Sequence, residues 1–195
     1  MTRPATPNPW PRLTDRHHGD PDRIAIILPG GGYTPARPLL HLARIVLAHH
    51  GWSVQELWWQ PPATPDLDER AGWVVAQAVA AVEAESAKRI MLVGKSLGTL
   101  AAPVAAARHL PAIWFTPLMF HASVVDALGA TQAPTQLFGG AADFSWDPRL
   151  ADDLGLPCLE LPGADHSLEH PDDPVRSAEN LLRVTRRLHE FVGGL

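Results

Sequence analysis

The sequence is a regular alternation of short apolar runs and longer segments with helical periodicity, which begins at Arg23 and repeats six times. Apolar runs of about five residues bounded by turn residues are typical of buried strands, whereas apolar residues three and four positions apart are typical of amphipathic helices. The expected strands are residues 24–28, 53–58, 89–93, 112–116, 135–138 and 157–161. The expected helices are residues 39–50, 69–86, 97–109, 123–130, 148–154 and 175–192.

This alternation predicts an α/β fold, a three-layer sandwich with a mainly parallel, six-stranded sheet. Parallel neighbours need crossover connections, and the crossover helices cover both faces of the sheet. Residues 23–195 are expected to form a single domain without a cap, since residues 117–122, after the fourth strand, are too few to build one. Residues 1–22 are rich in Pro, Arg, His and Asp and are expected to form an irregular arm.

Composition narrows the classes of protein that fit. The chain has 195 residues, 46% of them hydrophobic, which is enough for a sizeable core. A formal charge of −5 and 16 scattered basic residues argue against nucleic acid as a partner. The single cysteine, Cys158, argues against a disulfide scaffold and a zinc finger, and neither metal nor cofactor is expected. No apolar stretch approaches the roughly 18 residues of a membrane span, and residues 1–11 match no targeting peptide, so a cytoplasmic location is expected.

A possible nucleophile lies in the motif G-x-S-x-G, formed by Gly94, Ser96 and Gly98 between an apolar strand and a small-residue helix. Such a strand-to-helix turn lifts the serine hydroxyl out of the sheet in a strained conformation, and flanking glycines let it pack closely. The backbone N–H of Leu97 would face the same space and stabilise negative charge. A phosphate-binding loop is excluded, because its first glycine would have to stand at the position of Arg89.

The lysine inside this motif, Lys95, has two interpretations. A solvated or salt-bridged side chain is the expected one, because lysine is strongly hydrated. The alternative is a cation that lowers a neighbouring pKa or attracts an anionic substrate.

A serine nucleophile needs an imidazole to take its proton and a carboxylate to orient that imidazole. His166 is the expected base, because it alone among ten histidines follows a strand end in a G-x-x-H loop; His121 is the reserve. The run from His166 to His170 also matches the H-x-x-E-H pattern of zinc proteases, but Gly163 and Pro171 around it favour a loop over the required helix.

The expected acid is Asp143, which ends a G-x-x-D loop after the strand 135–138. The chain order is then Ser, Asp, His, the order of the α/β-hydrolase arrangement. Asp147 and Asp165 are alternatives, but Asp147 precedes a proline as a helix cap does, and Asp165 is adjacent to the base.

The first expected strand ends in Pro29 and three glycines, which allow the backbone to approach a ligand closely. Gly31 is the expected second oxyanion donor beside Leu97. A dinucleotide-binding loop is disfavoured, because the G-x-G-x-x-G spacing is absent. The substrate pocket is expected to include Gly32, Tyr33, Phe144 and Trp146, with packing of the aromatic residues beneath the loops as the alternative.

Together, the loops that carry Gly31, Ser96, Asp143 and His166 resemble those of the α/β-hydrolase superfamily over residues 23–195. The small size and the GKSLG turn are similar to compact, lidless members such as the dienelactone-hydrolase-like proteins, which have cysteine as the nucleophile. The chain departs from the superfamily pattern in two ways: Pro29 replaces the usual histidine before the oxyanion glycines, and the usual first two strands are missing.

The leading hypothesis is therefore a serine hydrolase that cleaves a carboxylic ester or thioester of a small or exposed acyl substrate. The rival is a hydrolase-like binding or scaffolding domain with weak or no activity. Acyl transfer and peptide hydrolysis would use the same residues and are not distinguished by them. The expected partner is a small acyl compound, with no membrane contact, and the sequence does not determine an oligomeric state.

Overall fold

The computed structural model describes residues 16–195. Its strands are β1 (Arg16–His17), β2 (Asp20–Leu28), β3 (Trp52–Glu56), β4 (Arg89–Lys95), β5 (Ala112–Phe115), β6 (Thr135–Gly140) and β7 (Cys158–Leu161). Its helices are α1 (Pro38–His49), α2 (Leu67–Glu83), α3 (Ala102–Ala107), α4 (Ala122–Ala130), α5 (Pro148–Leu154) and α6 (Pro174–Gly193), with a 3₁₀ helix, η1 (Ser96–Ala101), before α3.

The strands form one sheet in the order β1-β3-β2-β4-β5-β6-β7. All neighbours are parallel except β1, which pairs antiparallel with β3. The α/β class and the parallel sheet are thus confirmed, and each of the six expected strands is present. The expected number of strands is wrong by one, because β1 adds a seventh strand at the edge.

The start of the fold also differs from the expectation. Arg16 and His17 pair with Gln55 and Val54, and β2 begins at Asp20, so part of the segment expected to be irregular joins the sheet. A two-residue edge strand is too short to show apolar alternation, which is why the pattern missed it. Residues 1–15 of the expected arm lie outside the described residues.

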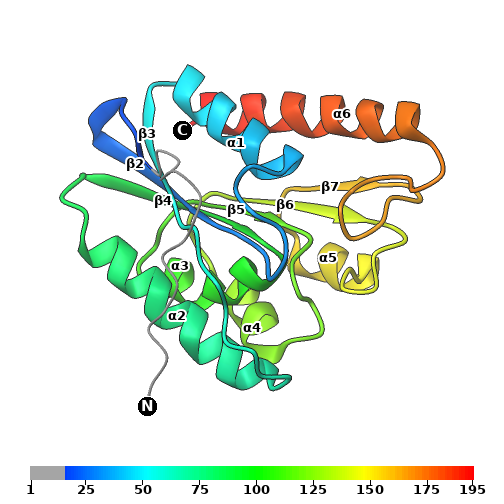
Figure 1. The fold of residues 1–195 in the computed structure, drawn as a ribbon, viewed down its shortest axis with the longest axis horizontal. Coiled ribbons are helices and arrows are strands. Elements are labelled where there is room, and N and C mark those ends of the chain that lie inside the picture. Colours follow the sequence, from blue (N-terminus) through cyan, green and yellow to red (C-terminus); the bar gives the residue numbers. More distant parts are fainter. Residues whose placement is uncertain (1–15) are drawn as a thin grey trace, which may run out of the picture.

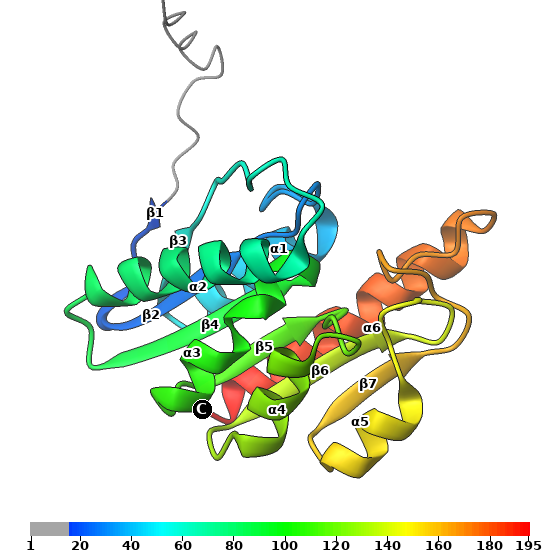
Figure 2. The same ribbon diagram turned by 90° about the horizontal axis from the view of Figure 1, so that it is seen from below.

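Helices cover both faces of the sheet. Figure 1 shows α1 and α6 on one side and α2 to α5 on the other, and Figure 2 shows the latter group from its own side. Alternate residues of β2 serve the two faces: Ile26 and Leu28 pack toward α2 and α3, whereas Ala25 and Ile27 pack toward α1 and α6. Because both faces are buried there, residues 24–28 of the strand form a continuous apolar run without polar alternation. Within residues 16–195, no helix is both long and apolar enough to cross a membrane.

The helix expected at residues 97–109 is divided. It begins as η1 at Ser96 and becomes the α-helix α3 only at Ala102. Pro103 explains the change, because it lacks a backbone N–H and is tolerated only in the first turn of an α-helix. The nucleophile motif therefore leads into a tight 3₁₀ turn.

Candidate active site

The nucleophile motif adopts the strained turn that its sequence predicts. Ser96 follows β4 with a φ of 52°, in the left-handed region that a residue with a Cβ rarely adopts. A Cβ on Gly98 would overlap the Leu28 carbonyl, and a Cβ on Gly94 would overlap the Trp114 ring. Both glycines are therefore required by close packing, and the turn is held against β2 and β5.

The structure brings Ser96, His166 and Asp143 together from three separate loops. His166 Nε2 lies 2.8 Å from Ser96 Oγ, and His166 Nδ1 lies 2.8 Å from Asp143 Oδ1. When Nδ1–H donates to Asp143, Nε2 is free to accept from the Ser96 hydroxyl. This arrangement can remove the serine proton as the oxygen attacks a carbonyl carbon.

Asp143 is buried and surrounded by donors. The backbone N–H of Ser145 donates to Asp143 Oδ1 at 2.9 Å, and the Ser145 hydroxyl lies 2.9 Å from both carboxylate oxygens of Asp143. Burial, the largest single effect, raises the pKa of Asp143, but the hydrogen bonds from His166 and Ser145 outweigh it and hold the pKa below its ordinary value. The carboxylate is therefore kept ionised beside the imidazole.

Sequence reasoning missed Ser145, whose hydroxyl also lies 3.2 Å from His166 Nδ1. A partial signal was present, because an aspartate commonly accepts a hydrogen bond from the backbone N–H two residues on, as Asp143 does from Ser145; nothing local indicated the hydroxyl contact. Ser145 is 2% exposed, so its hydroxyl is committed to the acid and the base.

The alternative acids have other roles. Asp147 caps α5 by accepting from Arg149 N and Leu150 N, as its position before Pro148 predicts. Asp165 accepts from Ser167 N and Glu169 N, and so shapes the turn that presents His166. Neither carboxylate is bonded to the imidazole.

The alternative histidine assignments also find their explanation. His121 lies against Asp68, with Nε2 3.2 Å from Oδ1, and its Nδ1 is 2.9 Å from Ser123 Oγ. Residues 166–170 form turns with no helix, as expected, so the two histidines of the H-x-x-E-H pattern do not share a helix face.

The three glycines after β2 lie beside the nucleophile turn. Gly30 N donates to the carbonyl of Tyr33 at 3.0 Å and closes the loop. Gly31 is exposed, and a Cβ on it would lie 3.9 Å from Leu97 Cδ2, so the two expected oxyanion donors belong to neighbouring segments. Gly32 is also exposed and has no heavy atom within 4 Å of its Cβ position. The direction of the Gly31 and Leu97 N–H groups toward an oxyanion remains a prediction.

Tyr33 and Trp146, two of the expected pocket residues, are mainly packing residues. Tyr33 is 8% exposed and accepts a hydrogen bond from Leu39 N on its phenolic oxygen. Trp146 is 7% exposed, lies against Gly139 and donates from Nε1 to Glu160 at 2.7 Å. These contacts agree with the alternative of packing beneath the loops, and a role of either ring in the pocket remains a prediction.

Phe144 behaves differently. Its side chain is 78% exposed, and its ring centroid lies 5.2 Å from that of His166. Phe120, which is 57% exposed, stacks on it with a centroid distance of 6.1 Å. We call Phe120 and Phe144 the aromatic shelf. Exposed aromatic surface is costly in water, and its position beside the imidazole suits an apolar group of a ligand.

The expectation for Lys95 is wrong. Its side chain is neither solvated nor salt-bridged: the residue is 2% exposed, and its Nζ lies 4.8 Å from the centroid of the Tyr33 ring. Burial lowers the pKa of Lys95 to about 8, although Asp143 and Asp165 partly oppose that shift.

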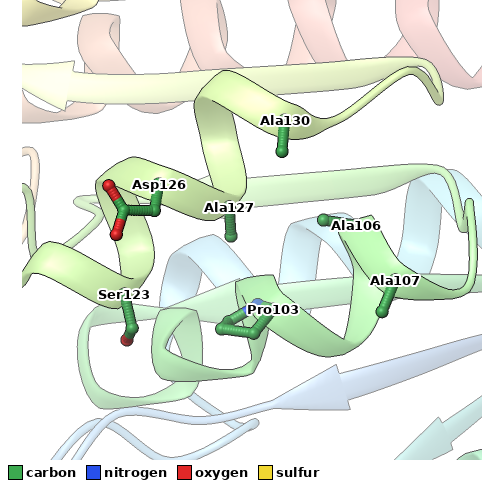
Figure 3. Close-up of a pocket in the computed structure, with 7 residues that line it drawn as sticks. All are labelled: Pro103, Ala106, Ala107, Ser123, Asp126, Ala127 and Ala130. Atoms are coloured by element: carbon green, nitrogen blue, oxygen red, sulfur yellow. The ribbon is translucent and has the colours of Figure 1, made fainter.

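Two surface hollows lie outside this constellation. The larger, of about 470 Å³, runs between α3 and α4 and is lined by Pro103, Ala106, Ala107, Ser123, Asp126, Ala127 and Ala130 (Figure 3). The other, of about 280 Å³, lies beside Glu56 and Trp58. Neither is lined by Ser96, Asp143 or His166.

No protein-family model and no curated protein matches the sequence. Solved structures do match the fold. The chain is similar to an alpha-beta serine hydrolase homologue from Coxiella burnetii, with a TM-score of 0.66 and 14% identity over 89% of this chain and 86% of that one. It is also similar to Est1E from Butyrivibrio proteoclasticus with ferulic acid bound, with a TM-score of 0.67 and 13% identity over 90% and 92%.

A third similar structure is XC6422 from Xanthomonas campestris, described as an α/β serine hydrolase without a lid. Its TM-score is 0.61, with 19% identity over 91% of this chain and 86% of that one. At these identities the likeness concerns the fold, and the fold agrees with the resemblance carried by the four loops. The chain therefore has the α/β-hydrolase fold, with a serine, a histidine and an aspartate in mutual contact at the carboxyl ends of its strands.

Proposed function

We propose that this protein is a serine hydrolase that cleaves carboxylic esters or thioesters. One observation carries the proposal: His166 lies within 2.8 Å of both Ser96 Oγ and Asp143 Oδ1. Those contacts are the ones required to activate a serine. The serine concerned, Ser96, has a strained backbone at the end of a strand.

The geometry supports a two-step reaction. His166 takes the proton of Ser96 while the serine oxygen attacks the carbonyl carbon, and negative charge develops on the carbonyl oxygen near the backbone of Leu97 and Gly31. His166 then gives the proton to the leaving alcohol or thiol, which departs as the acyl-enzyme forms. Water, deprotonated by His166, attacks that ester, and the proton returns to Ser96 as the acid is released.

The substrate we propose presents a small or exposed acyl group. Only residues 116–121 separate β5 from α4, so no lid is inserted there, and the aromatic shelf lies open beside His166. Two of the similar structures fit this proposal, one being described as lidless and another as having ferulic acid bound. An acyl or aryl group packed on Phe144 would hold its carbonyl close to Ser96.

The scaffolding alternative is less well supported. An inactive descendant has no need to preserve a strained serine backbone, which costs stability. We also propose a cytoplasmic location, because a chain with one cysteine forms no internal disulfide.

Labelling with a fluorophosphonate tests the activity. We expect a covalent adduct on Ser96 that Ser96→Ala abolishes, whereas Ser123→Ala, which removes a partly exposed hydroxyl within α4, keeps it. Kinetics on p-nitrophenyl and coenzyme A esters of increasing acyl length, with an aryl ester included, would then define the substrate. Absence of an adduct on native, folded protein would refute the proposal.

A further inference from the structure

The side chain of Lys95 has no role in the reaction described so far. The residue ends β4 immediately before Ser96 and is 2% exposed. Among residues 16–195, no side chain forms a salt bridge or a hydrogen bond with its ammonium group. The nitrogen is not among the fully buried atoms that lack a partner, but the residue as a whole has lost most of its contact with water. Removing most of the hydration of an ammonium without a paired carboxylate is expensive, so we expect an apolar residue to give a more stable protein at this position.

Strand periodicity explains how the lysine becomes buried. Side chains alternate between the two faces of a strand, so Lys95 shares a face with Met91 and Val93, which pack toward α1 and α6. At the end of that face it meets the loop that follows β2. A Cβ on Gly30 would lie 3.4 Å from Lys95 Cδ, so the aliphatic stem of the lysine packs directly beneath the first loop glycine.

The head of the side chain faces Tyr33, the anchor of that loop. Lys95 Nζ lies 4.8 Å from the ring centroid, within the range of a cation–π contact. Burial raises the pKa of Tyr33 to about 12, so the ring stays neutral and keeps its attraction for a cation. Tyr33 in turn receives a hydrogen bond from Gly30 N on its carbonyl and one from Leu39 N on its phenolic oxygen.

We propose that Lys95 is a positioning residue for the proposed hydrolase reaction: its buried ammonium, held against Tyr33, keeps the glycine loop in register with Ser96. The inference rests on the proposed function, because the loop is argued to supply the oxyanion donor Gly31. In this proposal Lys95, the residue before Ser96, supports the glycine loop through its contacts with Gly30 and Tyr33.

The charges around Lys95 give the proposal a pH signature. Tyr33 and, beyond it, Arg37 face it from the glycine loop, Asp143 from the loop after β6, and Asp165 from the loop after β7. Burial lowers the pKa of Lys95 to about 8. Above that pH the ammonium loses its proton and its attraction to the ring, so the turnover number should fall as pH rises through about 8.

The test compares two charge-removing variants. The chain has one other lysine, Lys88, whose side chain is exposed. Lys88→Met therefore makes the same substitution at an exposed site and is the matched control for Lys95→Met. We expect Lys95→Met to lower kcat by about 10- to 30-fold with KM within about threefold, as loss of a desolvated cation–π contact implies. We also expect its Tm to rise by a few degrees, because a costly buried charge is gone. Its kcat should no longer fall above pH 8.

Tyr33→Leu extends the test, since it removes the ring but leaves the lysine. If the two residues act as a unit, the double variant Lys95→Met, Tyr33→Leu should lose no more kcat than the worse single variant. Tyr33→Phe, which keeps the ring, should retain more kcat than Tyr33→Leu.

The outcomes separate this proposal from the proposed function. An unlabelled wild type refutes the hydrolase itself. A labelled wild type with an equally active Lys95→Met protein refutes the positioning role alone. A Lys95→Met protein that loses stability along with activity would assign the lysine a purely structural role and also overturn the inference. A slower and more stable Lys95→Met protein supports it.

Discussion

The two ends of β4 each carry a lysine, and the two lysines have opposite environments. At the amino end, Lys88 directly precedes the strand, its side chain is 77% exposed, and Nζ pairs with Asp22 at 2.7 Å. At the carboxyl end, Lys95 is 2% exposed and touches the Tyr33 ring. The same residue type is thus a surface charge at one end and a buried charge at the other.

The comparison shows where backbone strain and buried polar groups lie in this fold. Ser96 and Thr116 both follow parallel strands with positive φ values of 52° and 45°, and Thr116 Oγ1 is buried with no partner among the described residues. Asp143, too, is a buried charge at a strand's carboxyl end. Ser96, Thr116 and Asp143 thus place strain and buried polarity at the edge where parallel sheets bind their ligands. The opposite edge carries the exposed Lys88–Asp22 pair, although His109 there also has a positive φ of 51° and Gln136 is buried.

The largest effect should come from the carboxyl edge. Asp143→Asn should lower kcat by about 10⁴-fold, because the amide favours the wrong imidazole tautomer and leaves the imidazolium unsupported. Steady-state kinetics on an ester substrate would measure it. Asp147→Asn is the matched control, since asparagine caps a helix about as well as aspartate and should leave kcat unchanged. Equal kcat values in the two variants would rule out Asp143 as the acid.

A smaller effect is expected from the residue that supports the acid. Ser145→Ala should lower kcat by up to about tenfold and destabilise the fold by about 1–2 kcal/mol at pH 7, because it removes a hydrogen bond to a carboxylate.

The loss of stability has a defined pH dependence. Asp143 has a pKa below its ordinary value of 3.8 in the fold, so its ionised form contributes stability above that value, and the contribution disappears as pH falls through the lower native pKa. The difference in free energy of unfolding between wild type and Ser145→Ala should therefore be larger at pH 7 than at a pH well below 3.8, where Asp143 becomes protonated in the fold. Denaturant titrations at both pH values would reveal it, and a constant difference would contradict the assignment.

The smallest effect belongs to the amino edge. Lys88→Met should change the free energy of unfolding by less than about 0.5 kcal/mol and leave kcat unaltered, because an exposed ion pair is screened by water. Thermal unfolding and ester kinetics would measure both quantities. A large effect on kcat would mean that the two ends of β4 are not as different as their burial indicates.

Much of the site was predictable from local sequence. Ser96, Asp143 and His166 each follow an apolar run, and the ends of parallel strands meet at one edge of the sheet, so three distant residues could be assigned to one place. The role of Asp147 as a helix cap could also be predicted, because it stands before a proline. In these cases a residue's role depends on its immediate neighbours in the chain.

The rest required side-chain packing. Phe144 and Trp146 are two residues apart, yet Phe144 is 78% exposed and Trp146 is 7% exposed. Trp146 packs on Gly139 and donates to Glu160, whereas the Phe144 ring lies against the rings of Phe120 and His166. The contacts of Tyr33 with Leu39 N and Lys95 likewise depend on packing that the local sequence does not show.

By itself, the sequence determined the α/β class, the parallel sheet, the strained serine turn and the candidate set of Ser96, Asp143 and His166, since periodicity and turn chemistry are local properties. Only the tertiary structure decided that β1 completes the sheet edge, that Ser145 supports the acid and that Lys95 is buried against Tyr33. Burial depends on which segments pack together. The residues next to a charged side chain in the sequence do not indicate which distant segment will exclude water from it.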